Sequence, residues 1–290
     1  MTSSGVRPLP GRLVLLGHPV AHSLSPAFQN AALEQAGLPL RYEALDVPPA
    51  AFADVLRGIV AQRGAGNVTV PHKEEAARRC DLLLPAAERA GAVNTFWTDA
   101  DGALVGDNTD KGGVGALARH VLGRAPANLR VALVGAGGSA SAVLAAAERW
   151  PGCYVAVWSR TPERTRALVD RFAGVAHATR TLDDAVRDAD LVVNATPVGL
   201  HGEDVPVDPL ALKKGAAVMD LVYRRDALAI VTRGATPALK RAETPWVRRA
   251  RERGHRAADG LVMLVEQGAL AFERWFGVMP DRDAMWSAVR

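Results

Sequence analysis

The stretch that decides the fold is VALVGAGGSASAVLAAA, from Val131 to Ala147. Its first four residues are apolar and predict a buried strand, and the glycines after them predict a tight turn. The small residues beyond the turn predict a closely packed helix. Gly135, Gly137 and Ala140 fit the pattern G-x-G-x-x-G/A, in which the first glycine turns the chain, the second lets a pyrophosphate approach the backbone, and the third small residue lets the helix contact the strand. The free N–H groups at the start of such a helix bind phosphates.

The residues around the glycine turn strengthen this interpretation. Residues 153–158 predict a second strand at the spacing of a βαβ unit, and residues 191–194 predict a third. An NAD site has an acidic residue at the end of its second strand, roughly 20 residues after the glycines. This chain has Arg160 there, with Arg164 close by, and a guanidinium pairs bidentately with a phosphate. The pattern therefore indicates NADP rather than NAD; the alternative is that Arg160 is a solvated arginine at a strand end.

The composition indicates a globular protein without a membrane anchor. A chain of 290 residues with 49% apolar residues can form one large or two ordinary domains. No apolar run is long enough to cross a bilayer, and the first residues have no apolar signal-peptide core. Cys80 and Cys153 fit neither a disulfide framework nor a metal motif. We therefore expect a cytoplasmic protein without a metal site.

Most of the net charge of +4 lies in one segment. Residues 224–256 contain ten Lys and Arg against three Asp and Glu. A nucleic-acid surface is one interpretation, but Trp246 is the only Phe, Trp or Tyr within this segment, so a solvated helix face is favoured. Arginine outnumbers lysine 30 to 5 in the chain, which makes each lysine informative.

The first hundred residues alternate predicted strands and helices. Ser25 and Pro26 predict a helix start with a capping hydroxyl, and Gly37 predicts the end of that helix. The predicted strands are residues 13–17, 42–47, 67–70 and 92–97, with a hairpin partner near Leu104. The predicted helices are residues 25–36 and 49–60 and one that Pro71 opens. The crossovers between these elements favour a parallel sheet.

The second half of the chain predicts a second α/β unit and a returning helix. Residues 111–122 predict a helix that leads into the dinucleotide unit, whose last strand is residues 217–222. Apolar residues in 260–276 predict a mostly buried closing helix that packs back on the first unit. The domains are therefore expected at residues 1–110 with 258–290, and at 111–257. We expect a ligand between the two units, at the carboxyl ends of their strands.

Polar clusters follow the predicted strands of the first unit, at residues 22–25, 67–73, 91–95 and 106–110. Each cluster alone is explained by helix caps and turns. Lys73 is chemically distinct, because a lysine beside a carboxylate can give up a proton and an arginine cannot. Reduction of a ketone needs a proton at oxygen as hydride arrives at carbon, so a pair of Lys73 and Asp110 would suit that reaction. Lys111 is the rival lysine, and Lys73 as a plain surface charge is the other interpretation.

The chain resembles the shikimate dehydrogenases over nearly its whole length. The segments HSLSP, GNVTVPHKEEA, AGAVNT, GDNTD, VGAGG, SRT, NATPVG, MDLVY and DGLVMLVEQGA follow one another in the order of that family. The resemblance implies an open α/β substrate domain, a Rossmann-type doubly wound dinucleotide-binding domain and a C-terminal helix that returns to the first domain. It also implies NADP-dependent reduction of 3-dehydroshikimate to shikimate, in the pathway to chorismate and the aromatic amino acids.

The resemblance also implies residue roles. Lys73 and Asp110 match the catalytic pair of the family. The positions that match substrate ligands are Ser23, Ser25, Thr69, Asn94, Asp110, Tyr223 and Gln267. The positions that match cofactor contacts are Gly135, Ala136, Gly137, Gly138, Ser139, Ser159, Arg160, Thr161, Arg164, Leu221, Gly260 and Met263. A polyhydroxylated acid needs many fixed donors and acceptors, which suits this set.

One departure from the family and two other functions stay open at this point. About fifteen residues, from about Arg225 to Leu239, look inserted after Tyr223 and put the contact of Tyr223 in question. The first alternative function is a quinate or quinate/shikimate dehydrogenase that uses NAD. The second is a sensor without catalysis, which binds a metabolite and uses the basic insertion to dock a partner. We expect a small-molecule substrate, no nucleic acid and no membrane partner, and a monomer or homodimer.

Overall fold

The computed structural model describes residues 8–225 and 241–290. The expected insertion beyond Arg225 lies outside the described residues. The chain divides into two compact units, each with its own sheet. The first consists of Met1–Thr109 and Val265–Arg290, and the second of Asp110–Leu264.

The first unit is built on a six-stranded sheet with the order β2-β1-β3-β5-β6-β4. Its elements up to Thr109 are β1 (Leu13–Gly17), α1 (Ser25–Gln35), β2 (Tyr42–Asp46), a 3-10 turn (Pro49–Ala51), α2 (Phe52–Ala61), β3 (Ala65–Val68), α3 (Lys73–Arg79), β4 (Leu82–Leu83), α4 (Pro85–Ala90), β5 (Thr95–Thr98) and β6 (Leu104–Asp107). The strands expected at residues 13–17 and 42–47 are confirmed. The strand expected at residues 67–70 is β3 and ends at Val68, because the polar loop begins earlier than the apolar pattern indicated.

The sheet of the first unit is mixed, so the expectation of a parallel sheet is wrong there. β1 pairs in parallel with β2 and β3, whereas β5 pairs antiparallel with both β3 and β6. The hairpin expected near Leu104 is confirmed as β5 and β6, and its short turn permits only antiparallel pairing. The long connection between β3 and β5 permits either direction, and the pair is antiparallel. β4 then pairs in parallel with β6 at the sheet edge.

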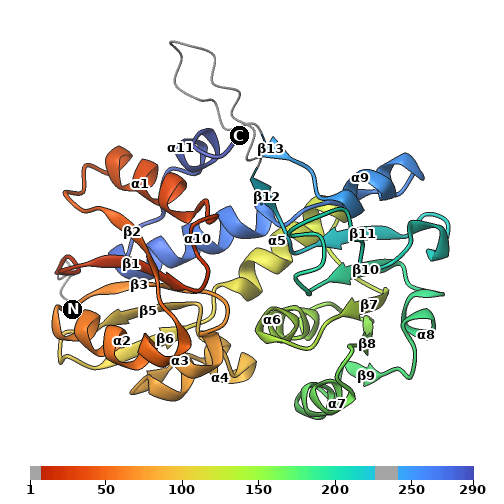
Figure 1. Ribbon diagram of the computed structural model, residues 1–290, viewed down its shortest axis with the longest axis horizontal. Coiled ribbons are helices and arrows are strands. Elements are labelled where there is room, and N and C mark those ends of the chain that lie inside the picture. The colour runs from red at the N-terminus through yellow and green to blue at the C-terminus, as the bar shows by residue number, and fades with distance from the viewer. Residues whose placement is uncertain (1–7, 226–240) are drawn as a thin grey trace. The chain divides into compact units, whose positions relative to one another are not determined.

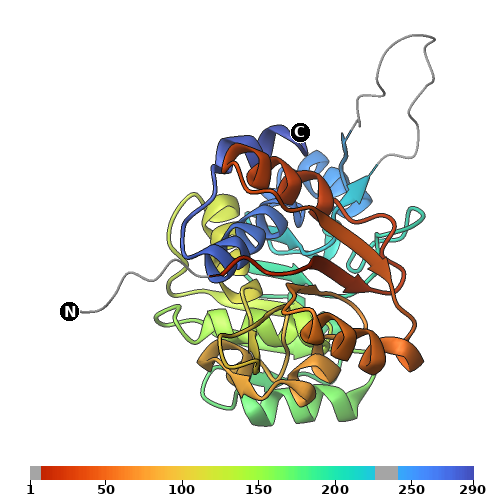
Figure 2. The ribbon, with the colours of Figure 1, turned by 90° about the vertical axis from the view of Figure 1, so that its left-hand side faces the viewer.

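Helices cover both faces of this sheet (Figures 1 and 2). Helices α2, α3 and α4 share a buried apolar cluster with the strands, which includes Phe52, Leu56 and Phe96. The other face is covered by α1 and by the end of the chain, α10 (Leu261–Phe276) and α11 (Arg282–Ser287). Helix α11 lies against α1. The expected return of the closing helix to the first unit is thereby confirmed.

Two helix starts in the first unit differ from the sequence prediction. Ser25 is the first residue of α1 rather than its cap, because Leu24 occupies the cap position without a side-chain hydrogen bond. The backbone N–H of Ser25 instead donates to Oγ of Ser23, 3.2 Å away. The helix expected to open at Pro71 begins two residues later, at Lys73.

The second unit has a six-stranded sheet in which every strand pair is parallel, with the order β14-β11-β10-β7-β8-β9. When the central strand β7 is counted as the first strand, this is the strand order of the doubly wound dinucleotide-binding fold. Its elements are α5 (Asp110–Leu122), β7 (Arg130–Val134), α6 (Gly138–Ala147), β8 (Tyr154–Trp158), α7 (Pro162–Arg171), β9 (Ala176–Ala178), α8 (Leu182–Val186), β10 (Leu191–Asn194), a 3-10 turn (Pro209–Ala211), β11 (Ala217–Asp220), β12 (Arg224–Arg225), β13 (Arg241–Ala242), α9 (Pro245–Glu252) and β14 (Ala257–Ala258).

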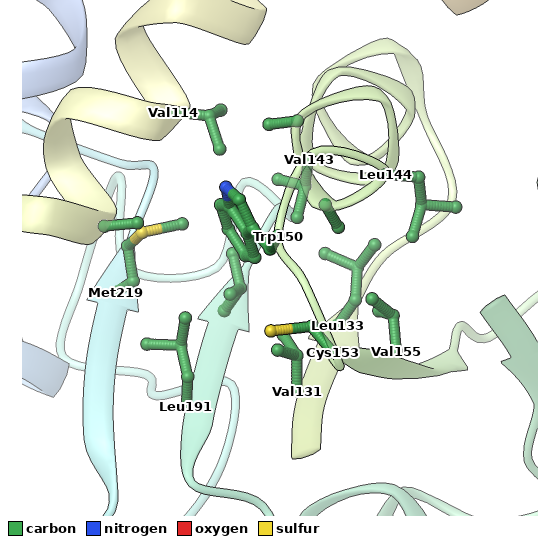
Figure 3. Packing of buried hydrophobic residues seen from close by; sticks show 14 of the residues in the cluster. Val114, Val131, Leu133, Val143, Leu144, Trp150, Cys153, Val155, Leu191 and Met219 are labelled. Atoms are coloured by element: carbon green, nitrogen blue, oxygen red, sulfur yellow. The ribbon is translucent and has the colours of Figure 1, made fainter. Parts of the chain in front are cut away.

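Side chains of the central strand β7 alternate between two apolar clusters. Val131 and Leu133 pack with α5, α6 and α7, whereas Ala132 and Val134 pack with α8 and α9. Figure 3 shows the first cluster, in which the indole of Trp150 lies among side chains of the strands and of α5 and α6. Residues 140–147 of α6 are all buried, which confirms the closely packed helix expected from its small residues.

The described part of the basic segment includes the helix α9, which has one buried and one solvated face. In α9, Trp246, Val247 and Ala250 are buried. Arg248 forms an ion pair with Glu203, and Arg251 forms one with Glu243.

The described residues contain two free cysteines, and burial raises the pKa of Cys80 to about 12. In residues 8–225 and 241–290 we find no cluster of His, Cys, Asp and Glu suited to a metal ion. The same residues include no helix that combines the length and hydropathy needed to span a bilayer.

Candidate active site

The glycine turn after β7 has two glycines with different roles. Gly135 has φ of +119°, and an added Cβ would lie 2.8 Å from the carbonyl oxygen of Ala195. Both the backbone angle and the close contact require glycine at this position. Gly137 has φ of −100°, and an added Cβ would meet nothing within 4 Å. The fold therefore requires Gly135, whereas Gly137 keeps a space open beside the helix start.

Helix α6 begins directly beyond this open space. Its cap residue is Gly137, so no side chain caps the first N–H groups of the helix. These N–H groups and the positive end of the helix dipole suit a phosphate. The third small residue of the pattern, Ala140, is fully buried against the sheet. The residues present thus fit the pyrophosphate of a dinucleotide.

The loop after β8 lies next to the glycine turn. Strands β7 and β8 are in register with Val134 opposite Trp158, and the backbone N–H of Gly135 donates to the carbonyl of Trp158 at 2.8 Å. The hydroxyl of Ser159 donates to the carbonyl of Thr161 at 3.0 Å and lies 2.7 Å from the hydroxyl of Thr165. These bonds fix the loop that carries Arg160, Thr161 and Arg164.

Arg160 and Arg164 are both exposed. Within the described ranges neither forms an ion pair, whereas the neighbouring Arg166 on α7 pairs with Glu163. A guanidinium without a protein carboxylate is available to a phosphate on a ligand. The position and the exposure of Arg160 thus agree with the expected contact to a 2′-phosphate.

A third group of expected cofactor residues meets at the end of β11. An added Cβ on Gly260 would lie 2.3 Å from the carbonyl oxygen of Leu221, so these two backbones are in direct contact. The N–H of Gly260 donates to the carbonyl of Val222 at 2.9 Å. Met263 is buried in the cluster against which Leu221 packs. The structure therefore brings Leu221, Gly260 and Met263 together, although about forty residues of sequence separate them.

A buried polar network supports this end of the sheet, and the sequence analysis did not include it. Asp220 accepts hydrogen bonds from the Thr244 hydroxyl at 2.7 Å, the Asn194 amide at 2.9 Å and the N–H of Val222 at 3.1 Å. Burial raises the pKa of Asp220 to about 7; the hydrogen bonds oppose this rise and the nearby Asp259 adds to it. Polar residues at the ends of the apolar strands β10 and β11 were the signal for this network.

The substrate-side amides of the first unit form a second network. The amide nitrogen of Asn94 donates to Oγ1 of Thr109 at 2.9 Å and to Oε1 of Gln267 at 3.0 Å, and its oxygen accepts from the N–H of Thr109 at 2.7 Å. All three residues are buried. The structure thus joins two expected ligands, Asn94 and Gln267, directly. It adds Thr109, which was not among the expected site residues, as a second partner of Asn94.

Two more buried side chains, those of Asn67 and Tyr42, support this amide network. The amide nitrogen of Asn67 donates to the carbonyl oxygen of Asn94 at 3.0 Å, and the hydroxyl of Tyr42 donates to Oδ1 of Asn67 at 2.7 Å. Asn67 was part of a polar cluster in the sequence but was not assigned a role. Tyr42 gave no signal, because it reads as an ordinary aromatic residue of a strand.

The other expected substrate residues of the first unit follow β1 and β3. Ser23 is half-buried and Ser25 is buried, and they are joined by the hydrogen bond described above. Thr69 is half-buried, and its methyl group packs over Gly17 so closely that an added Cβ there would lie 2.4 Å away. Its N–H donates to the carbonyl of Leu16 at 2.8 Å. Thr69 is therefore held just beyond β3 and against β1, whereas Ser23 and Ser25 lie at the start of α1.

The two expected catalytic residues begin helices in different units. Lys73 is the first residue of α3 and is half-buried, and its carbonyl accepts from the N–H of Val93 at 2.9 Å. Asp110 is the first residue of α5 and is 3% exposed. Tyr223, the remaining expected ligand, is half-buried in the second unit just before β12.

Comparison with known proteins decides the family. Residues 15–96 match the model of the shikimate dehydrogenase substrate binding domain, and residues 260–290 match the shikimate 5'-dehydrogenase C-terminal domain. A curated NADP(+) shikimate dehydrogenase from Chelativorans sp. (strain BNC1) is 40% identical over 93% of this chain and 92% of its own length. The chain belongs to the shikimate dehydrogenase family. This result confirms the resemblance seen in the sequence.

Solved structures of shikimate dehydrogenases share the fold. The enzyme from Aquifex aeolicus has a TM-score of 0.84 with 30% identity and covers 100% of both chains. The shikimate dehydrogenase from Thermus thermophilus, solved in complex with NADP(H) and shikimate, has a TM-score of 0.78 and 39% identity over 96% of this chain and 97% of its own. The fold class expected from the sequence is therefore confirmed.

Proposed function

We propose that this chain catalyses the reversible, NADP-dependent reduction of 3-dehydroshikimate to shikimate. The observation that carries the proposal is the glycine turn: it leaves an open space at Gly137 before an uncapped helix start, within a chain whose relatives are named NADP(+) shikimate dehydrogenases. The enzyme is an oxidoreductase with a small-molecule substrate. Its place is the pathway that leads to chorismate and the aromatic amino acids.

The second unit holds NADP in this proposal. Residues 135–139 bind the pyrophosphate through backbone N–H groups, and the loop from Ser159 to Arg164 binds the adenosine part, with Arg160 and Arg164 at the 2′-phosphate. Leu221, Gly260 and Met263 support the nicotinamide. The bound cofactor supplies the hydride when 3-dehydroshikimate is reduced.

The first unit carries most of the substrate ligands of this proposal. Ser23 and Ser25 bind the carboxylate, and Tyr223 is assigned to it as well. Thr69, Asn94 and Gln267 bind the ring hydroxyls. Because Asn94 and Gln267 are already buried and hydrogen-bonded to each other, their amides are fixed before the substrate arrives, which favours a ligand with matching hydroxyls.

Lys73 and Asp110 are the proton-transfer residues of this proposal. As the ketone is reduced, the ammonium group of Lys73 donates a proton to the carbonyl oxygen, and in the reverse direction the neutral amine accepts it from the hydroxyl. The carboxylate of Asp110 is the second member of this proton-transfer pair. Lysine suits this role because its amine exchanges a proton far more readily than a guanidinium.

The basic face of α9 serves ion pairs with Glu203 and Glu243 and has no role in binding nucleic acid. Two free thiols agree with a reducing, cytoplasmic location.

The direct test is the absorbance of NADPH formed when the purified protein is mixed with NADP and shikimate. Turnover is expected with this pair, and kcat/KM should be lower with quinate or with NAD. A clear preference for quinate and NAD would replace the proposal with a quinate dehydrogenase. Binding of shikimate without turnover would instead indicate a sensor.

A further inference from the structure

An ion pair joins α10 to the end of β6. Its two residues are close in sequence to members of the amide network of Asn94, Thr109 and Gln267. Nε of Arg274 donates to Oδ2 of Asp107 at 2.7 Å. The Asp107 side chain is 3% exposed, whereas that of Arg274 is 47% exposed. A buried carboxylate without a partner is costly, and Arg274 supplies a charged partner for Asp107.

The ion pair and the amide network connect the same two segments. Gln267 and Arg274 are seven residues apart on α10, which is about two helical turns, so both lie on one face of the helix. On the opposite side, Asp107 ends β6 and Thr109 follows two residues later. The hydroxyl of Thr109 donates to Oε1 of Gln267 at 3.5 Å, so each segment contacts the other at two points, through this long hydrogen bond and through the ion pair.

Asp107 also shapes the turn that carries Thr109. Its Oδ1 accepts from the N–H of Asn108 at 2.7 Å. The amide of Asn108 donates to the carbonyl of Ala92 at 2.8 Å, two residues before Asn94. The carboxylate thus connects the helix that carries Gln267 with the loop that carries Thr109, and through Asn108 with the chain that leads to Asn94.

We propose that Asp107 and Arg274 are positioning residues for substrate binding. The ion pair fixes the position of α10 relative to the end of β6. Gln267 therefore keeps its hydrogen bond to Asn94, and both amides keep the orientation in which they bind the hydroxyls of the substrate. This inference rests on the proposed function, in which Asn94 and Gln267 are substrate ligands. It assigns no chemical step to the pair.

The test compares Arg274→Gln with Arg282→Gln. Arg282 pairs with Glu266, the residue before Gln267 on the same helix, at 3.2 Å, so the control removes an ion pair of α10 outside the amide network. For Arg274→Gln we expect KM for shikimate to rise about ten-fold, with kcat and KM for NADP within about two-fold. For Arg282→Gln all three constants should stay within about two-fold.

Two further variants separate positioning from a merely structural role. Arg274→Lys keeps a cation beside Asp107 and should restore KM for shikimate to within about three-fold of the wild type. In the double variant Asp107→Asn with Arg274→Gln, the second change should add little to the first, as expected of groups that act through one contact. Melting temperatures of all variants are measured in parallel.

The outcomes are distinct. If Arg274→Gln lowers the melting temperature but leaves KM for shikimate unchanged, the pair is structural and the inference is overturned. An equal rise of KM in Arg282→Gln overturns it as well. If the wild type itself neither binds nor oxidises shikimate, the proposed function fails first and the inference fails with it.

Discussion

The buried carboxylate of Asp220 accepts a hydrogen bond from the hydroxyl of Thr244, 2.7 Å away in space and 24 residues further along the chain. Thr244 is also the cap of α9, where its hydroxyl accepts from the N–H of Val247 at 3.3 Å. One hydroxyl therefore joins the end of β11 to the start of α9. The contact also places a carboxyl group with an altered pKa in the interior of the second unit.

Asp220 should make stability depend on pH between about 4 and about 7. Its pKa is about 7 in the folded protein, against about 3.9 for an unfolded aspartate. In this window the folded state binds a proton that the unfolded state has released, so the contribution of Asp220 to stability is complete below the window and is lost as pH rises through it. Asp220→Asn should remove this slope, with an effect of up to about 4 kcal/mol.

The measurement is the free energy of unfolding in urea from pH 5 to pH 8, for the wild type and for Asp220→Asn. The exposed Asp170 offers a control as Asp170→Asn, whose curve should run parallel to the wild type. If the free energies of unfolding of Asp220→Asn and the wild type changed with pH in parallel, the pKa of Asp220 would be the same in the folded and unfolded protein, and the prediction would be wrong.

Lys73→Ala should lower kcat by roughly 100-fold or more while KM for shikimate changes little. The reason is that the variant loses the proton donor and keeps the hydroxyl ligands. Lys111→Ala, at the second residue of α5, is the matched control and should retain activity. Normal turnover by Lys73→Ala would reassign Lys73 as a surface charge.

Arg160→Ala should weaken NADPH binding without affecting NADH binding. Loss of a charge-assisted contact to the 2′-phosphate corresponds to about 10- to 100-fold in the dissociation constant. Cofactor titrations by fluorescence would measure both constants. Arg166→Ala removes an arginine of α7 that pairs with Glu163 and should leave both unchanged. An equal loss for NADPH and NADH would exclude a role at the 2′-phosphate.

Alanine should lower the stability of the protein at Gly135 and the affinity for NADP at Gly137. Gly135→Ala brings a Cβ against the carbonyl of Ala195 at a positive φ and should lower the free energy of unfolding by about 1–3 kcal/mol. Gly137→Ala places its methyl in open space, so stability should be kept while the affinity for NADP falls. Thermal unfolding and cofactor titration of both variants test the pair. Tight NADP binding by Gly137→Ala would mean that the pyrophosphate lies elsewhere.

The elements that the sequence predicted well have strong local patterns. The strands at residues 13–17 and 42–47 and the small-residue helix α6 are examples. β4 has two residues, too few to show a period, and it was not predicted. The hairpin of β5 with β6 was predicted, whereas the antiparallel pairing of β5 with β3 was missed, because a short apolar run is the same whichever way its neighbour runs. The start of α1 was misplaced by one residue because Ser25 is a good sequence signal for a cap, whereas the cap position is held by Leu24 without a side-chain hydrogen bond.

By itself the sequence determined the cofactor half of this protein. Its glycine turn, the helix after it and the arginine beyond the second strand lie within about 30 residues, so local geometry forces them together. Only the tertiary structure decided that the amide of Asn94 donates a hydrogen bond to Gln267, 173 residues later. It likewise decided that the buried carboxylate of Asp220 accepts one from Thr244. Such contacts depend on the order of strands in a sheet and on the register of a returning helix. Neither leaves a periodic trace in the sequence, since both are fixed by the packing of the whole unit.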